Sequence, residues 1–423
     1  MKTMLDTRCV VIRILSQLRF SVISLLLMWA LCADGVAADI LRSLTQEAFK
    51  HSQMPWKPQT PTPLTEFDSP ENDGSLGLDF VEYTKMNSAP FYDDGTWWVR
   101  ANPRGNSEKD PLDLRLSQPE TGSQAPVVYH IDDFNYRHPG IQPPLPQAIP
   151  AAARYLSAID IGFHQRDVKR WPQILHLGGN GYGRLTGFPP LGFGTSFRFG
   201  VHKAGEPDED FVKLRKLYLM KLNDQAFRLL GLVECEAFAA AFTATLQPGE
   251  TSSLRVAMKI FLRFPLRLAN KPSVGPLGLS SMFWKDESAT PNVPTDEAHD
   301  ADRFVSWSAE GVERWQTLAI PNNPIAPPLE TNFGPVTDFA LIQSDRNAGH
   351  YRRYDAVEYA NRASLLVSDI ESSLPYTVGL WQSYTTYEGA DNIAVFVRFD
   401  QDAPLPASIK DGITFSYTLT AYR

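Results

Sequence analysis

The chain has 423 residues, of which 43% are hydrophobic and 21% are charged, with 33 prolines, 27 glycines and 3 cysteines. These fractions are close to those of globular proteins, so they exclude a disordered, collagen-like or disulfide-stabilised chain. The net charge of −8 and the lack of a basic run argue against nucleic acid as a partner and favour a neutral or hydroxyl-rich one.

The N-terminus has the pattern of a secretory signal peptide. Basic residues between Lys2 and Arg19 precede an uncharged run over 20–33, and Val36-Ala37-Ala38 offers a site for signal peptidase. The run is shorter than the roughly 20 residues that a membrane-spanning helix needs. We therefore predict a signal peptide over 1–38 and no stable membrane span after cleavage. Of the three cysteines only Cys235 would remain, which excludes an internal disulfide and C-x-x-C motifs.

The next segments prepare for the folded body. Apolar residues at helical spacing predict a short helix over 39–50, with Asp39 as a possible N-cap. Prolines between Pro55 and Pro70 then predict an extended lead-in that ends near residue 75. We expect one large domain from residue 76 to residue 423, because no repeat or long polar linker interrupts it.

Most of this domain has the pattern of β-strands. Apolar and polar residues alternate over 413–423 and over 254–264, and further strands are expected at 376–385 and 393–399. Turn residues such as Pro248-Gly249 separate the strands. Many short strands with glycine and proline between them predict an all-β fold, a large antiparallel β-sandwich.

Three segments need a separate interpretation. The run 237–242 fits a helix by its alanines and a buried strand by its context, and periodicity does not decide between them. The proline-rich stretch 139–153 predicts a long surface loop. The glycines between Gly178 and Gly187 lack the other residues of a phosphate-binding loop, so they predict a turn with close backbone approach.

No motif for a nucleotide, a nucleophilic serine or a zinc helix is present, so we expect no cofactor. Polar residues instead gather in three segments: 296–303, 345–353 and 388–392. Three interpretations compete for them. They are solvated loops; or His299, Asp300, Asp302 and His350 hold a metal; or two distant carboxylates perform the acid/base chemistry of glycoside hydrolysis.

The same segments resemble the periplasmic glucan biosynthesis family (MdoG/OpgG and OpgD). The resemblance is carried by motifs that keep their order along the chain: Asp160-Ile161-Gly162-Phe163, Gly194-Thr195-Ser196-Phe197-Arg198, Ser280-Ser281-Met282-Phe283-Trp284, His299-Asp300-Ala301-Asp302, Pro321-Asn322-Asn323-Pro324, Phe339-Ala340-Leu341-Ile342-Gln343 with Asp345-Arg346 and His350-Tyr351, and Glu388-Gly389-Ala390-Asp391-Asn392. It implies a periplasmic protein with a sandwich of the galactose-mutarotase-like type, whose partner is a β-glucan oligosaccharide or polysaccharide.

The resemblance also implies an activity and residue roles. Members of the family are implied to be β-1,2-glucanases that invert the anomeric centre, with Asp391 as general acid and Asp300 as general base. The remaining candidates are expected to bind sugar or relay a proton: Ser196, Arg198, His299, Asp302, Arg346, His350, Tyr351 and Glu388.

The chain departs from the family pattern in three places. The family's Trp-Arg-Pro-Leu is replaced by Trp315-Gln316-Thr317-Leu318, and the tryptophan of its Pro-Ser-Leu-Trp segment is replaced by Leu366. Family members also continue past the strand matching 413–423 into an immunoglobulin-like domain that is not in this sequence. These departures keep two alternatives open: a non-catalytic glucan-binding or assembly protein, and an enzyme that acts on a different sugar.

Overall fold

The computed structural model describes residues 35–57, 87–103, 110–117, 123–127, 134–135, 156–164, 172–188, 192–203, 210–263, 274–285, 297–318, 328–351, 356–383, 391–400 and 410–423. Most of the predicted signal peptide, most of the proline-rich lead-in and the predicted loop 139–153 lie outside these ranges. Glu388 and the side chain of Asp391 also lie outside the described part.

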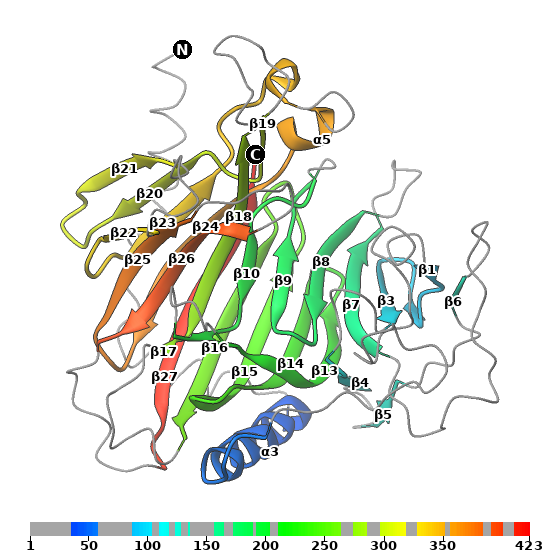
Figure 1. The fold of residues 1–423 in the computed structure, drawn as a ribbon. Coiled ribbons are helices and arrows are strands. Elements are labelled where there is room, and N and C mark those ends of the chain that lie inside the picture. Colours follow the sequence, from blue (N-terminus) through cyan, green and yellow to red (C-terminus); the bar gives the residue numbers. More distant parts are fainter. Residues whose placement is uncertain are drawn as a thin grey trace, which may run out of the picture.

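Two sheets of eleven strands each make up most of the described chain (Figure 1). Sheet 1 contains, in spatial order, β2 (Tyr92–Asp93), β3 (Trp97–Pro103), β7 (Leu156–Phe163), β8 (Gln173–Gly178), β9 (Tyr182–Leu185), β10 (Ser196–Arg198), β18 (Leu277–Lys285), β26 (Asp391–Phe399), β25 (Tyr376–Gln382) and β22 (Leu329–Asn332), with β19 (Glu297–His299) paired to β18. Sheet 2 contains β21 (Glu313–Thr317), β20 (Arg303–Trp307), β23 (Asp338–Ile342), β24 (Ser364–Ser372), β27 (Ile413–Tyr422), β16 (Ser253–Leu262), β15 (Phe238–Gln247), β14 (Ala226–Glu234), β13 (Lys213–Asn223), β4 (Asp113–Ser117) and β5 (Gln124–Pro126).

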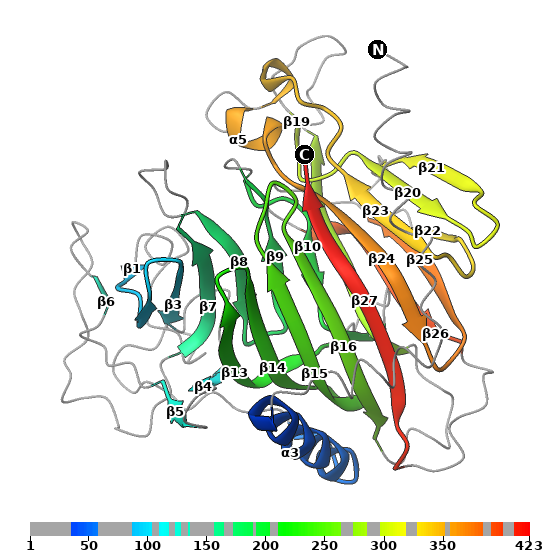
Figure 2. The ribbon, with the colours of Figure 1, turned by 180° about the vertical axis from the view of Figure 1, so that it is seen from behind.

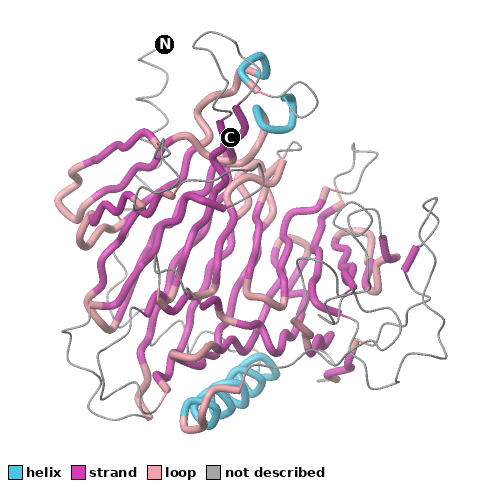
Figure 3. The backbone as a smooth tube through the Cα atoms, viewed as in Figure 1, coloured by secondary structure: helices cyan, strands magenta, loops and turns pink. Residues whose placement is uncertain are grey.

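Short elements complete the described chain. They are the helices α3 (Gly35–Ser52), η3 (Ala348–His350) and α5 (Ala356–Ala360), the strand pair β1 (Asn87–Ser88) and β6 (Phe134–Asn135), and the three-stranded sheet of β12 (Asp210–Phe211), β11 (Val201–His202) and β17 (Val274–Gly275). Figure 3 shows how strongly strands dominate. Among the strand pairs described, only β4 with β13 is parallel.

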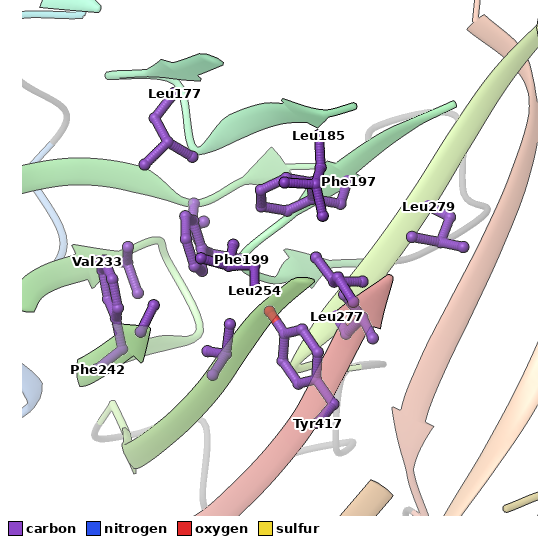
Figure 4. Packing of buried hydrophobic residues seen from close by; sticks show 14 of the residues in the cluster. Leu177, Leu185, Phe197, Phe199, Val233, Phe242, Leu254, Leu277, Leu279 and Tyr417 are labelled. Atoms are coloured by element: carbon purple, nitrogen blue, oxygen red, sulfur yellow. The ribbon is translucent and has the colours of Figure 1, made fainter. Parts of the chain in front are cut away.

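The two sheets face each other across one hydrophobic core (Figures 1 and 2). In β27 the inward residues alternate as the sequence predicts, with Phe415 and Tyr417 fully buried. Figure 4 shows Phe197, which belongs to β10 of sheet 1, in the same core as Phe242, which belongs to β15 of sheet 2. The prediction of an all-β antiparallel sandwich is therefore confirmed, and the four predicted strands form β16, β25, β26 and β27.

Helix α3 covers the outer face of sheet 2 across β14, β15 and β16 (Figure 2). It begins at Gly35, so the predicted N-cap was wrong: Asp39 lies inside the helix and forms an exposed ion pair with Arg42. The apolar spacing of the helix continues upstream through Ala37, which is buried against the sheet. The helix therefore starts earlier than the sequence pattern from residue 39 suggested.

The ambiguous run 237–242 forms the start of strand β15 from Phe238 onward, and its composition fits the two environments of that strand. Phe238 and Phe242 point into the core between the sheets, whereas Ala239 and Ala241 lie on the opposite face under α3. Small side chains there allow the helix to approach the sheet closely. The alanines, whose helix propensity suggested a helix at this position, instead form the surface of the strand that contacts α3.

Removing a side chain from this contact is expected to destabilise the fold. Leu44 is buried between α3 and sheet 2, so Leu44→Ala is expected to lower the free energy of unfolding by about 2–5 kcal/mol. Urea unfolding measures the change. Arg42→Ala, on the exposed face of the same helix, is expected to change it by less than about 0.5 kcal/mol. Equal effects of the two substitutions would contradict the packing described.

The glycine cluster forms a turn with close backbone approach, as predicted. A Cβ atom on Gly179 would lie 2.3 Å from the carbonyl oxygen of Asp110, and one on Gly187 would lie 2.3 Å from that of Glu250. Gly181 has a positive φ of 72°, which favours glycine. Gly179 and Gly181 lie in the turn between β8 and β9, and Gly187 follows β9. All three glycines approach neighbouring backbone closely.

Candidate functional site at the ends of three neighbouring strands

Three neighbouring strands bring the two predicted catalytic aspartates to one end of sheet 1. Strand β18 pairs with β19 on one side, with Phe283 opposite His299, and with β26 on the other side, with Met282 opposite Asp391. The backbone N–H of Asp300 donates to the carbonyl oxygen of Met282 at 3.0 Å. The backbones of Asp300 and Asp391 therefore flank Met282, about two strand spacings or ~10 Å apart.

A β-bulge fixes the start of β26 at this point. The register shifts between Ser281 and Met282, so that Asn392 has no direct partner on β18. Its buried amide bonds Phe283 twice, accepting from the N–H at 2.8 Å and donating to the carbonyl oxygen at 2.9 Å, and also donates to the carbonyl oxygen of Ser383 at 3.1 Å. Bulges commonly re-aim neighbouring side chains.

Loss of this amide is expected to destabilise the end of β26. Asn392→Ala leaves the N–H and carbonyl groups of Phe283 without that partner, at a cost of about 1–3 kcal/mol in unfolding free energy. Asn332→Ala is the control, because its side chain is exposed and accepts from a turn N–H of Gly334. Urea unfolding measures the two changes in unfolding free energy. If Asn332→Ala lowers it as much as Asn392→Ala does, Asn392 does not stabilise the bulge.

The Asp300 carboxylate is buried, with 2% of the residue exposed. One oxygen forms an ion pair with the Arg362 guanidinium, and the other accepts a long hydrogen bond, 3.4 Å, from the N–H of Met282. The same guanidinium lies 3.8 Å from the ring centroid of Tyr359. Arg362 is therefore held between a carboxylate and an aromatic face, and it covers the predicted base.

Aromatic rings continue from this ion pair. Tyr359 stacks on Tyr351 with centroids 5.7 Å apart, Tyr351 meets the edge of His299 at 5.0 Å, and His299 stacks on Phe283 at 5.2 Å. The rings connect the helix α5 and the turn after η3 to β19 and β18. This small cluster packs the segments 343–351 and 356–362 onto the ends of the strands.

The buried Gln343 side chain ties the same loops together. Its amide nitrogen lies within hydrogen-bond distance of the His299 carbonyl oxygen at 3.2 Å, the Tyr351 hydroxyl at 2.9 Å and the Tyr359 carbonyl oxygen at 2.9 Å. The Tyr351 hydroxyl in turn donates to the carbonyl oxygen of Asp345 at 2.7 Å. Of the predicted residues, His299, Asp300 and Tyr351 thus share one network.

Two other predicted residues serve the adjoining loop. The Asp302 carboxylate accepts from the N–H groups of Ser344 and Asp345 at 2.9 and 3.0 Å, and from the Ser344 hydroxyl at 2.7 Å. His350 is 54% exposed at its side chain and lies 2.7 Å from the Asp345 carboxylate. These contacts hold the loop that follows β23 and do not involve Asp300.

Arg346 lies beneath the same loop. Its guanidinium donates to the carbonyl oxygens of Ala360 and Arg362 at 3.2 and 2.5 Å. Burial, together with the charge of Arg423, lowers its pKa from the ordinary value. Arg346 therefore holds the backbone of Arg362, the residue that pairs with Asp300.

Ser196 and Arg198 lie on β10, which pairs directly with β18 in sheet 1. The Ser196 hydroxyl is buried and lies 2.6 Å from that of Ser280, whereas Arg198 lies 4.2 Å from the ring centroid of Tyr182. Within the described residues, no group of three or more His, Cys, Asp and Glu side chains is placed to hold a metal ion. The four proposed ligands divide between the Asp300 network and the Asp302 loop.

Sequence reasoning missed the partners of the predicted residues. Arg362 and Tyr359 received no role, and Gln343 and Asn392 were noted only as members of motifs. Nothing in the local pattern marks a loop arginine as the partner of an aspartate 62 positions away. For Gln343 and Asn392, the signal in the sequence was that each is the last residue of a motif shared with the family.

Comparison with known proteins shows the family of this chain. The family described as "Periplasmic glucan biosynthesis protein, MdoG" matches residues 41–423, nearly the whole chain. The chain belongs to this family. The match contains all three strands of the candidate site and the loops packed on them. Among the described helices of this MdoG-family chain, none has the length and apolar character that spanning a membrane requires.

The relatives match over parts of their length. A glucans biosynthesis protein D 1 of Ralstonia nicotianae is 28% identical over 227 residues, 48% of this chain and 39% of that protein. A glucans biosynthesis protein G of Rhodopseudomonas palustris is 28% identical over 212 residues, 48% of this chain and 40% of that protein. Each match thus spans about two fifths of the relative. A putative aldose 1-epimerase of Escherichia coli K12 aligns in structure with a TM-score of 0.21 and 6% identity, over 49% of this chain and 67% of that one.

Proposed function

We propose that this chain processes periplasmic glucans as an anomer-inverting β-1,2-glucanase, with Asp391 as general acid and Asp300 as general base. Membership of the glucan biosynthesis family supports the substrate class. The observation that carries the proposal is the position of both aspartates at one end of sheet 1, on either side of Met282. Inverting glycosidases place their two carboxyl groups about 6.5–9.5 Å apart, which leaves room for the attacking water.

The surroundings of Asp300 are compatible with the role of base. A base must hold its carboxylate in the ionised form, and an ion pair with a guanidinium suits that form. Water must reach the carboxylate during the reaction, which requires Arg362 to move aside or to pass its hydrogen bonds to the sugar. Arg362 is thus proposed as a positioning residue for Asp300.

Product analysis tests the proposal. Purified protein is incubated with linear and with cyclic β-1,2-glucans. The expected result is cleavage of the glucan, with new reducing ends that first have the inverted anomeric configuration. NMR measures the anomeric configuration as the reaction proceeds. No cleavage of either glucan would refute the glucanase proposal. Cleavage with retained configuration would refute the assignment of Asp300 as a base that activates water.

One observation favours a second candidate, a non-catalytic glucan-binding or assembly protein. Asp300 is nearly inaccessible, and one oxygen of its carboxylate is paired with the guanidinium of Arg362. For this candidate, calorimetry is expected to show glucan binding while the glucan is recovered intact. Turnover of the bound glucan would exclude it.

A further inference from the structure

Four strands stand at the ends of the two large sheets, and three of them have features that block a further strand. Strand β2 is only two residues long, β5 is three residues long and ends at Pro126, and β22 follows Pro328 directly. An edge strand presents unpaired backbone N–H and C=O groups to other strands, and short length or a neighbouring proline prevents such pairing. The fourth edge, β21, lacks these protections.

Strand β21 is regular and open along its outer side. Its five residues, Glu313–Thr317, each pair with a residue of β20 without a bulge, and none is proline, glycine or lysine. All of them are exposed except Gln316, which is partly buried. In the part of the chain that the structure describes, no strand pairs with the side of β21 that faces away from β20 (Figures 1 and 2). This edge is therefore available to a further strand.

An exposed tryptophan lies in the middle of this edge. Trp315 is 51% exposed and lies directly opposite Val305 of β20. Val305 in turn lies opposite Ala340 of β23, which lies opposite Leu366 of β24, so the four side chains share one face of sheet 2. The last three form a small buried cluster that is separate from the main core. Trp315 extends this apolar row to the open edge, and tryptophan is enriched where proteins contact one another.

A second copy of the chain fits this edge in one register. In a symmetric dimer the two β21 strands run antiparallel about a two-fold axis, and an axis at Trp315 places the two tryptophans directly opposite each other. The same register places Arg314 opposite Gln316 and Glu313 opposite Thr317, so no like charges meet. A register centred on Arg314 or on Glu313 would instead oppose two like charges, which is unfavourable. One centred on Gln316 would pair fewer residues of the strand.

Complementary charges flank the tryptophan pair in this register. On β20, Arg303 lies directly opposite Thr317, and both Arg303 and Glu313 are exposed. Across the join, the order on one face is therefore Arg303, Thr317 and then Glu313 of the second copy. The backbones of the arginine and of that glutamate are two strand spacings, or ~10 Å, apart. Because the threonine side chain between them is short, the two long side chains can meet above it, and the two-fold axis generates this pair twice.

We propose that β21 is a dimerisation edge, on which a second copy of this chain pairs antiparallel about Trp315 and joins the two copies of sheet 2 into one continuous sheet. The charge pattern favours this occupant, because Arg303 and Glu313 complement each other across the two-fold axis. A contact over one short strand buries less than the roughly 1,200 Å² of stable interfaces, so the dimer is expected to form at high protein concentration. The inference does not depend on the proposed function.

Sedimentation equilibrium of the purified protein over about 1–500 µM measures the dimerisation. The average mass is expected to rise from that of the monomer toward that of the dimer. Trp315→Arg removes the aromatic pair and opposes two guanidinium groups, so the Kd for dimerisation is expected to rise by about tenfold or more. Leu329→Arg is the matched control, since Leu329 is 50% exposed on the other edge strand β22, and it is expected to leave the Kd within about twofold of wild type.

Exchange of the two charges tests the register. Arg303→Glu and Glu313→Arg each create like charges across the join, and each is expected to raise the Kd about fivefold. The double variant restores opposite charges, and its Kd is expected to return to within about twofold of wild type. An equimolar mixture of the two single variants is expected to form a heterodimer, because both charge pairs are then complementary.

A protein that stays monomeric over the whole concentration range would overturn the proposal. A dimer that Trp315→Arg leaves intact would also overturn it, since the contact would then lie on another surface. If the double variant dimerises as weakly as the single ones, pairing about Trp315 is wrong. Thermal unfolding checks that each variant is folded, which is expected because the substituted side chains are exposed.

Discussion

Asp300→Asn and Asp391→Asn are each expected to lower kcat on β-1,2-glucan by about 10²–10⁴-fold, the usual contribution of a general acid or base. The amide in Asp300→Asn does not accept a proton from water at neutral pH, and that in Asp391→Asn does not protonate the leaving oxygen. Initial rates of reducing-end release give kcat and KM. We expect KM to change far less than kcat, because the amide keeps the size and shape of the carboxyl group.

The control for these variants is Glu330→Gln, an equally small change at a carboxylate that is 47% exposed and lies on the edge strand β22. Its kcat is expected to stay within about twofold of wild type, since surface substitutions rarely matter. If either aspartate variant keeps the wild-type rate, the corresponding role is wrong. If all three variants lose activity equally, the loss reflects folding rather than catalysis.

Glu234→Ala is expected to lower the free energy of unfolding by about 3–5 kcal/mol, because it leaves two buried guanidinium groups without their carboxylate. Glu234 forms ion pairs with Arg215 at 2.8 Å and Arg263 at 2.5 Å, and His51 of α3 lies 3.1 Å from it. The Trp56 ring covers both guanidinium groups, at 5.2 and 5.1 Å. Urea unfolding measures the loss.

Glu330→Ala serves as the matched control for this variant as well. It breaks an ion pair of similar length, 2.6 Å to Arg398, at a much more exposed position. The expected loss is less than about 1 kcal/mol, since solvent screens the pair. A loss as small as this for Glu234→Ala would mean that water or neighbouring groups compensate the two arginines, which would contradict the buried network.

The same carboxylate predicts a dependence of stability on acid. Burial raises the pKa of Glu234, but the hydrogen bond from His51 and the charges of Arg215 and Arg263 lower it overall, from 4.5 to about 2. The unfolded chain therefore binds this proton more readily, so the stabilisation is complete above pH 4.5 and is lost as the pH falls toward 2. Its size is about 3 kcal/mol. The difference in unfolding free energy between wild type and Glu234→Gln should shrink over this range, and a constant difference would contradict the shift.

The alternation of apolar and polar residues was sufficient to predict a strand where one face of the strand is buried and the other is exposed. Alternation over 413–423 and 254–264 predicted β27 and β16 with their inward faces, because a two-sided strand between core and exterior leaves that signature. It failed at 237–242, where both faces of β15 are buried: phenylalanines fill the core, and alanines receive α3. A strand buried on both faces loses the alternation on which the prediction depends.

The sequence by itself determined the strands, the family and the motifs that contain Asp300 and Asp391, because these are carried by residues close together in the chain. Only the tertiary structure decided that Asn392 bonds Phe283, 109 positions away, that Arg362 pairs with Asp300, and that Asp160 on β7 bonds His176 on β8. Each of these contacts joins different strands or loops. Which strands become neighbours in a sheet depends on the packing of the whole sandwich, and no local pattern records it.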